Sequence, residues 1–178
     1  MSAVITRMRL DGTGLDAADL AGRYRDWLVR IEQMHQGARA WTNPEPAFTR
    51  LQVPMSQARV ALLTSAGAYL EGQDAFDVAD PHGDPSFRLL PGDVDLGRLR
   101  FAHSHYDTAR AEQDPNVVLP LDRLRELAAD GAVGSVAAAH VGMMGFNPDP
   151  ARLVEESAPR IADLLREEGV DVALLTPG

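Results

Sequence analysis

Segment 59–64 constrains the fold of this chain more than any other feature. It reads Arg-Val-Ala-Leu-Leu-Thr, an almost unbroken apolar run that Ser65-Ala66-Gly67 ends. Apolar runs of this length between turn residues are typical of parallel strands that are buried on both faces. Apolar patterns predict further strands at 99–103, 134–141 and 170–175.

Two helical patterns separate the later strands. In segment 120–128 the apolar side chains share one helical face, and Gly131 follows as a stop. A second apolar stripe begins after Asp149-Pro150 and ends at Gly169. Pro159 interrupts this stripe, so the helix either kinks there or starts afresh with Ser157 as its cap.

Because strands and helices alternate, the chain is expected to form an α/β domain. The sheet should be mostly parallel and flanked by helices, in a three-layer, doubly wound arrangement. A further helix is predicted over 16–36, with Asp16 as its N-cap, Gly37 as its stop and a stiff connector at 41–46 after it. We therefore predict an N-terminal helical and connector segment, 1–50, packed on one domain, 51–178.

A long acidic insertion lies between Tyr69 and Leu99. It contains seven acidic residues and two arginines, and its prolines and glycines disfavour helices. Loops of this length in compact domains are usually functional or poorly ordered. We expect an ordered loop that crosses the edge of the sheet.

Charge and composition limit the partners. The formal net charge is -9, which disfavours nucleic acid because phosphate binding needs a basic surface. The chain contains neither cysteine nor lysine, which excludes thiolate and lysine Schiff-base chemistry within these residues. No apolar run approaches the roughly 20 residues that span a bilayer. We expect a cytoplasmic protein with no membrane partner.

Polar residues follow the predicted strands. Parallel sheets of this class bind ligands at the carboxyl ends of their strands. The candidate residues for binding a small substrate there are Thr64, Ser65, Gly67, His140 and Thr176.

His103, His105 and Asp107 form the pattern richest in chemistry. If the strand extends through them, alternate side chains point the same way. Three interpretations follow from the residues alone. With His140 as a fourth ligand, the group resembles a zinc or iron site; alternatively the side chains bind substrate or perform acid–base catalysis; or the histidines are structural and Asp107 caps the next turn.

Two other segments each allow a structural and a functional interpretation. Asp114-Pro115-Asn116 is typical of a turn that feeds a helix, or it presents Asn116 as an orienting donor in the same crevice. The glycine-flanked loop 142–146 either packs in the core, lines a pocket or contacts another subunit.

Four segments together resemble one protein family. These are Gly-Asp-Pro-Ser-Phe-Arg at 83–88, His-Ser-His-Tyr-Asp at 103–107, the run at 114–124 and Leu-Leu-Thr-Pro-Gly at 174–178. They look like the glycine/sarcosine/betaine/D-proline reductase selenoprotein B family, and most closely its short D-proline-reductase-type members. The resemblance covers about 24–178.

The resemblance implies a reaction and partners. Family members cleave the carbon–nitrogen bond at the α-carbon of an amino acid reductively, with electrons from dithiols or a thioredoxin-like donor. In D-proline reductase a partner subunit supplies a pyruvoyl group. His103, His105 and Asp107 would then bind the substrate or protonate the leaving amine, and we expect an oligomer.

In this family a selenocysteine or cysteine follows the Thr-Pro-Gly sequence as the nucleophile. We expect the same residue directly after Gly178, encoded by a UGA codon that reads as a stop, and beyond it a C-terminal helix and strand. The 178 residues alone are then expected to be inactive. The competing hypotheses are a non-catalytic binding or assembly subunit and a metal-dependent enzyme built on the histidine cluster.

Overall fold

The computed structural model describes the backbone of residues 17–34 and 49–178 and the side chains of 22–34 and 49–178. The chain divides into two compact units, Met1–Thr42 and Asn43–Gly178. The smaller unit contains helix α1, Ala17–Met34, which confirms the predicted N-terminal helix. The expected caps Asp16 and Gly37 and the connector 41–46 lie outside the described residues. The packing of 1–50 on the domain stays a prediction.

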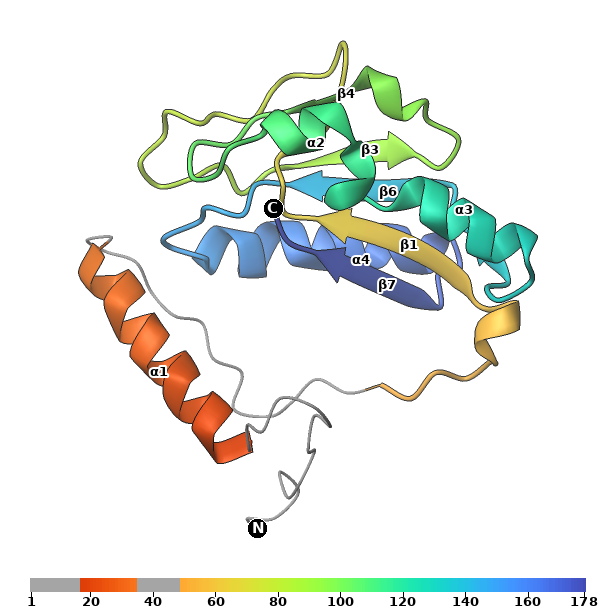
Figure 1. The fold of residues 1–178 in the computed structure, drawn as a ribbon, viewed down its shortest axis with the longest axis horizontal. Coiled ribbons are helices and arrows are strands. Elements are labelled where there is room, and N and C mark those ends of the chain that lie inside the picture. Colours follow the sequence, from red (N-terminus) through yellow and green to blue (C-terminus); the bar gives the residue numbers. More distant parts are fainter. Residues whose placement is uncertain (1–16, 35–48) are drawn as a thin grey trace. The chain divides into compact units, whose positions relative to one another are not determined.

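The larger unit is built on a five-stranded, mostly parallel sheet (Figure 1). Strand β1, Arg59–Thr64, is central: β7, Val172–Thr176, pairs along one side of it in parallel. On the other side β1 pairs in parallel with β5, Ser135–Val136, and then with β6, Ala139–Met143. The predicted parallel α/β sheet is confirmed.

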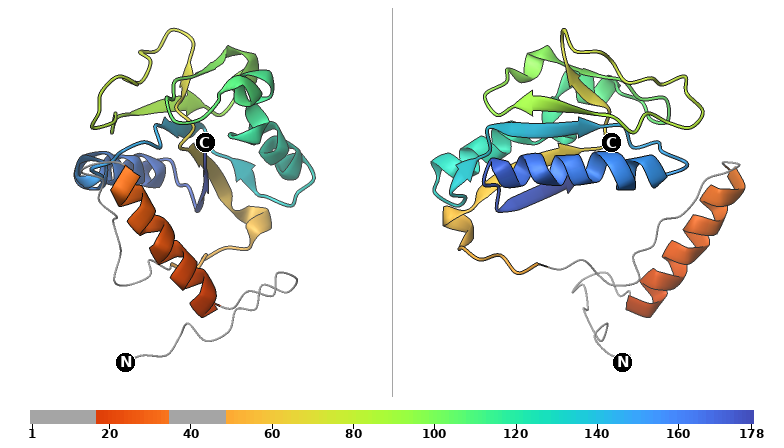
Figure 2. Two further views of the ribbon diagram at one scale, coloured as in Figure 1. Left: turned by 60° about the vertical axis from the view of Figure 1, so that its left-hand side comes forward. Right: turned by 180° about the vertical axis from the view of Figure 1, so that it is seen from behind.

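Helices cover both faces of this sheet, as the three-layer prediction requires (Figure 2). Alternate residues of β1 enter two separate cores. Val60 and Leu62 pack on the side of α3, Leu121–Ala129, whereas Ala61 and Leu63 pack on the side of α4, Ala158–Glu167. Strand β1 is therefore buried on both faces from Val60 onward, as its apolar run predicts.

Helix α4 starts directly after Ser157, with Pro159 in its first turn as one of the two alternatives predicts, but the Ser157 side chain does not cap it. A π-helical turn, Leu153–Ser157, leads directly into α4, and Pro159 occupies the first turn, where the amide that proline lacks is not needed. Ser157 has helical backbone angles and donates its hydroxyl to Pro85 O at 2.6 Å instead of capping the helix.

The strand predicted at 99–103 is present, but it is shorter than predicted and lies outside the main sheet. Strand β4 spans only Leu99–Phe101 and pairs antiparallel with β2, Ala68–Leu70, in a separate two-stranded sheet. Three-residue strands have too few positions for an apolar period to specify their partner. His103 and His105 consequently lie in a loop, and two short helices follow them: α2, Ala109–Gln113, and the 3₁₀ turn η3, Pro115–Val117.

Two further strand predictions need correction. The strand predicted at 134–141 is interrupted at Ala137 and Ala138, which separate β5 from β6. The acidic insertion contains a strand that the sequence did not predict: β3, Phe87–Pro91, pairs antiparallel with β6 at the edge of the sheet. Pro91 is compatible with an edge strand because its outer side needs no donor. Short 3₁₀ turns complete the unit at Met55–Gln57 and Leu96–Arg98.

Candidate active site

The carboxyl ends of β1, β6 and β7 meet at one edge of the sheet. Thr64 is paired with both Gly142 of β6 and Thr176 of β7. Beyond the strands, Ser65 N donates to Thr176 O at 3.0 Å, and Gly178 N donates to Ser65 Oγ at 3.3 Å. In Figure 1 the C-terminal residue accordingly lies beside the end of β1. The sequence-predicted residues Ser65 and Thr176 are therefore brought together.

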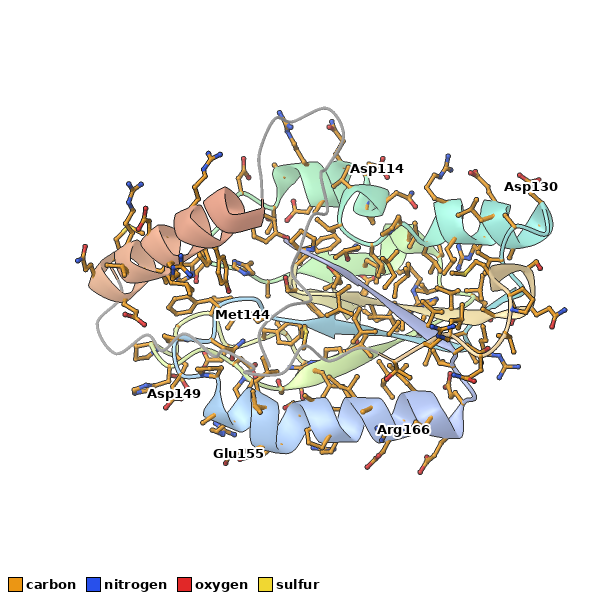
Figure 3. All side chains as sticks on the ribbon, turned by 90° about the horizontal axis from the view of Figure 1, so that it is seen from below. Asp114, Asp130, Met144, Asp149, Glu155 and Arg166 are labelled. Carbon is orange, nitrogen blue, oxygen red and sulfur yellow. The ribbon has the colours of Figure 1, made fainter. Side chains whose placement is uncertain are left out.

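Thr64 and Gly67 shape the backbone of this edge. Thr64 is fully buried, and its hydroxyl accepts a hydrogen bond from Ala66 N at 3.3 Å. Gly67 has φ of +71°, and a Cβ there would lie 2.0 Å from Ala102 O, so glycine is required. Met144, labelled in Figure 3 directly after β6, forms an antiparallel bridge with Ala66.

The Thr176 hydroxyl connects β7 to the end of the 3₁₀ turn η3. It lies 2.5 Å from Val118 O and 3.3 Å from Leu63 O, so its single proton is shared between two carbonyl groups. This arrangement holds the last residues of β7 against the end of β1.

His103 and His105 lie next to each other in the loop after β4. The rings are perpendicular with centroids 6.0 Å apart, and His105 N donates to His103 Nδ1 at 3.0 Å. Because Nδ1 of His103 accepts this bond, the proton of the neutral ring is on Nε2. Ser104 Oγ lies 2.9 Å from His105 Nδ1.

Two aromatic residues complete this cluster: Tyr106, for which the sequence predicts no role, and Phe146, from the loop 142–146 that the sequence predicts as core, pocket wall or subunit contact. Phe146 stacks on His105 with ring centroids 3.7 Å apart, and Tyr106 lies 4.7 Å from His103. Tyr106 also donates its hydroxyl to Ala66 O at 2.8 Å. The sequence feature that could have pointed to Tyr106 is its position inside the His-Ser-His-Tyr-Asp motif.

The surroundings change the titration of this cluster. Burial, and to a smaller extent the neighbouring His105, lower the pKa of His103 below its usual value of 6.5. Burial and the nearby Glu112 raise the pKa of Tyr106 above 10.0. Both side chains are therefore neutral at pH 7, and His103 can act as a hydrogen-bond donor through Nε2.

The Gly-Asp-Pro-Ser-Phe-Arg segment supports this cluster from outside. A Cβ on Gly83, whose φ is +77°, would lie 2.2 Å from Phe146 O, so the loop approaches that backbone closely. Burial acts to raise the pKa of Asp84, but hydrogen bonds from Ser86 and Asp77 and the charge of Arg88 hold it below its usual value. The Asp84 carboxylate, through these hydrogen bonds and the neighbouring Arg88, thus holds the loop in its conformation.

Asp107 and Asn116 have partners of their own. The Asp107 carboxylate accepts a bond from Ala109 N at 3.0 Å at the start of α2. Asn116 bonds through its side chain to Asp114 and Asp122 beside a cavity of about 480 Å³. Asp114, labelled in Figure 3, precedes η3. Their predicted catalytic and binding roles stay predictions.

His140 is buried in the sheet. It is 0% exposed, and its Nδ1 accepts a hydrogen bond from Leu62 N at 3.0 Å, close to the interruption between β5 and β6. Its Nε2 is buried without a hydrogen-bond partner among the described residues. Burial, and secondarily the charge of Arg125, lower the pKa of His140 to about 4.

We expect this buried histidine to make stability depend on pH. The unfolded chain binds the proton with a pKa near 6.5 and the folded chain with one of about 4. The contribution of His140 to the free energy of unfolding is therefore fully present above pH 6.5. It is lost as the pH falls from 6.5 to about 4, and the loss amounts to about 3 kcal/mol. His140→Asn keeps an acceptor for Leu62 N but does not titrate, so urea unfolding between pH 4.5 and 7.5 should show a smaller decline. The exposed His82→Asn is the control; equal declines in His140→Asn and wild type would contradict the assignment.

The described residues do not bring three histidine or acidic side chains together as a metal site, and His103, His105 and Asp107 are all among them. The metal-dependent alternative therefore has no geometric support among the side chains of 22–34 and 49–178. In the same part of the chain, no helix is long and apolar enough to cross a membrane.

The sequence is similar to a known family and to several of its members. The family model described as glycine/sarcosine/betaine reductase selenoprotein B matches residues 43–178. The chain is similar to the D-proline reductase subunit gamma of Acetoanaerobium sticklandii, with 37% identity over 135 residues, 76% of this chain and 54% of that protein. It is also similar to the glycine reductase complex component B subunit gamma of Carboxydothermus hydrogenoformans and the betaine reductase complex component B subunit beta of Peptoclostridium acidaminophilum. Each is 32% identical over 75% of this chain and 32% of the relative.

The chain thus spans about half the length of the first of these relatives and about a third of the other two. No solved structure shows significant similarity to it. The matched region contains the whole sheet and the cluster at its carboxyl edge. This chain belongs to the glycine/sarcosine/betaine reductase selenoprotein B family.

Proposed function

We propose that this chain is part of an amino-acid reductase subunit and forms one wall of its active site. The reaction is the reductive cleavage of the carbon–nitrogen bond at the α-carbon of an amino-acid-type substrate. One observation carries the proposal: Gly178, after β7, lies against Ser65, Ala66 and Tyr106, and the ring of His103 lies 4.7 Å from that of Tyr106. This is the edge where the family motif has its nucleophile.

The proposed nucleophile is a selenolate or thiolate directly after Gly178. In the balanced reaction the C–N bond is replaced by one C–H and one N–H bond, and a dithiol is oxidised to a disulfide. The nucleophile forms a bond to the α-carbon as the C–N bond breaks, and the nitrogen takes a proton as it leaves. One thiolate of the dithiol then attacks the selenium or sulfur atom, and the α-carbon takes a proton as its bond to that atom breaks. Attack by the second thiol closes the disulfide and releases the nucleophile. The amide N–H of Gly178 donates a hydrogen bond to Ser65 Oγ, so the residue before the proposed nucleophile is held at this edge of the sheet.

His103 binds the substrate in this proposal. Its Nδ1 accepts from His105 N, which leaves Nε2–H as a neutral donor. This N–H group can donate a hydrogen bond to a substrate carboxylate. His105 orients the ring through its backbone amide, and the contact with Phe146 holds His105 in place.

The exposure of β7 supports additional protein around it. Leu174 and Leu175 are 48% and 69% exposed, whereas parallel strands are usually covered on both faces. We propose that a further segment of the full-length subunit covers this strand. The greater length of the relatives agrees with this.

A pyruvoyl-containing partner subunit and a dithiol or thioredoxin-like donor complete the proposed enzyme, because the chain is similar to a D-proline reductase subunit. The test combines the full-length protein with its partner subunits. Dithiol-dependent reduction is measured with D-proline, glycine, sarcosine and betaine.

We expect one of these substrates to be reduced, and we expect the codon after Gly178 to be UGA or a cysteine codon within a longer open frame. A different codon there, or activity that survives alkylation of selenols and thiols on this subunit, would overturn the catalytic role. A complex that needs this chain only to assemble would identify it as an assembly subunit.

A further inference from the structure

We propose that Tyr106 is a positioning residue of the site: its hydroxyl holds the loop after β1, and its ring supports Gly178 and covers His103. The inference rests on the proposed function for its effect on turnover. Its structural part concerns contacts that can be measured without any activity.

The hydroxyl connects two loops that are 40 residues apart in the sequence. Tyr106 Oη donates to Ala66 O at 2.8 Å. Ala66 is fully buried, and its amide is already bonded to Thr64 Oγ1. The flanking amides of Ser65 and Gly67 bond to β7 and β6, so this loop determines the spacing of all three strand ends.

The ring of Tyr106 fills the space between the other parts of the site. A Cβ built on Gly178 would lie 3.0 Å from Tyr106 Cε1 and 2.7 Å from Ala66 Cα. The same ring lies 4.7 Å from the ring of His103 and packs on the core on the α3 side of the sheet. Tyr106 therefore lies next to Gly178, the loop after β1 and the candidate substrate-binding histidine.

The hydrogen bond also shows why Tyr106 positions other groups and does not react. Its single hydroxyl proton is donated to a backbone carbonyl, so it is not available as an acid. Two titratable groups affect this part of the site. His105 lowers the pKa of His103, after the larger effect of burial, and Glu112 on α2 raises the pKa of the Tyr106 phenol, again after burial.

The first experiment removes only the hydroxyl. In Tyr106→Phe we expect amide hydrogen exchange of Ser65, Ala66 and Gly67 to become about 10-fold faster, because a net hydrogen bond to a buried carbonyl is lost. In the reconstituted enzyme, kcat should fall about 10-fold with little change in KM, because the parts of the site are displaced relative to one another. Tyr69→Phe is the matched control, since it removes a hydroxyl from a half-buried tyrosine whose ring packs edge-on against Phe76.

The second experiment removes the ring. Tyr106→Leu exposes His103 to water, so its pKa, followed by NMR of the imidazole, should rise toward the ordinary value of histidine. Tyr106→Phe should leave that pKa unchanged because the ring remains. A residue that only stabilised the fold would not separate the two variants in this way.

Unchanged exchange of residues 65–67 in Tyr106→Phe, or an unchanged His103 pKa in Tyr106→Leu, would overturn the proposal. Both measurements use the chain without substrate. An inactive wild-type complex would therefore count against the proposed function and leave these two results to decide the role of Tyr106.

Discussion

Replacing His103 by asparagine is expected to lower the turnover of the reconstituted reductase by about 100-fold or more. The asparagine Oδ1 takes the place of Nδ1 and still accepts from His105 N, whereas the Nε2 edge of the ring is lost. Removal of a positioned polar donor or acid–base group from an active site typically costs 10²- to 10³-fold, so an effect of about this size is expected. The measurement is kcat and kcat/KM with the substrate that the wild-type complex reduces.

The pH profile gives a second check on the same variant. Because burial and His105 lower the pKa of His103, the wild-type activity should be retained down to a pH below 6.5 and then fall as this ring is protonated. His103→Asn should lack that acid limb. His82→Asn, the same change at an exposed histidine outside the cluster, is the control. A loss of less than about 3-fold in His103→Asn would return His103 to a structural role.

Replacing Gly142 by alanine is expected to destabilise the larger unit by about 3 kcal/mol or more. Gly142 lies in β6, between β1 and β3, and is buried. A Cβ there would lie 1.9 Å from Ala68 O and 2.9 Å from Ala68 C, so the backbone of β2 would have to move. In thermal unfolding this corresponds to a fall in Tm of about 10 °C.

Gly97→Ala is the matched control for Gly142→Ala. The new Cβ at position 97 would meet only the exposed side chain of Asp95, whose Oδ1 lies at 3.3 Å and accepts a hydrogen bond from Gly97 N, so no backbone has to move. We expect the free energy of unfolding to change by less than about 1 kcal/mol. Equal Tm values for wild type and Gly142→Ala would show that β2 does not cross β6 as closely as described.

The motif residues divide into structural and site residues in a way that their order along the chain does not reveal. Asp84 and Arg88 belong to the family-like segment at 83–88, yet Asp84 bonds to its own loop and Arg88 binds the carbonyl groups of Asp74 and Ala75. Asn116 is likewise engaged by Asp114 and Asp122. These contacts depend on loop geometry, so a motif alone does not distinguish a side chain that binds ligand from one that holds a loop.

The sequence by itself determined the elements with a strong period. The apolar run at 59–64 specified a strand buried on both faces, and the stripes at 120–128 and 153–165 specified helices, because burial of a continuous apolar surface dominates the folding free energy. The alternation of these elements was enough to predict a parallel sheet between helices, and the motifs at its carboxyl edge were enough to indicate the family.

Only the tertiary structure decided which short segments pair and which side chains meet. Strands β2 and β4 have three residues each, and their pairing rests on contacts between residues about 30 positions apart. For the same reason His103 lies in a loop beside Tyr106, and His105 stacks on Phe146. His140 lies inside the sheet and accepts a hydrogen bond from Leu62 N. Hydrogen bonds and ring contacts between distant residues leave no period in the sequence, so they appear only when the chain is folded.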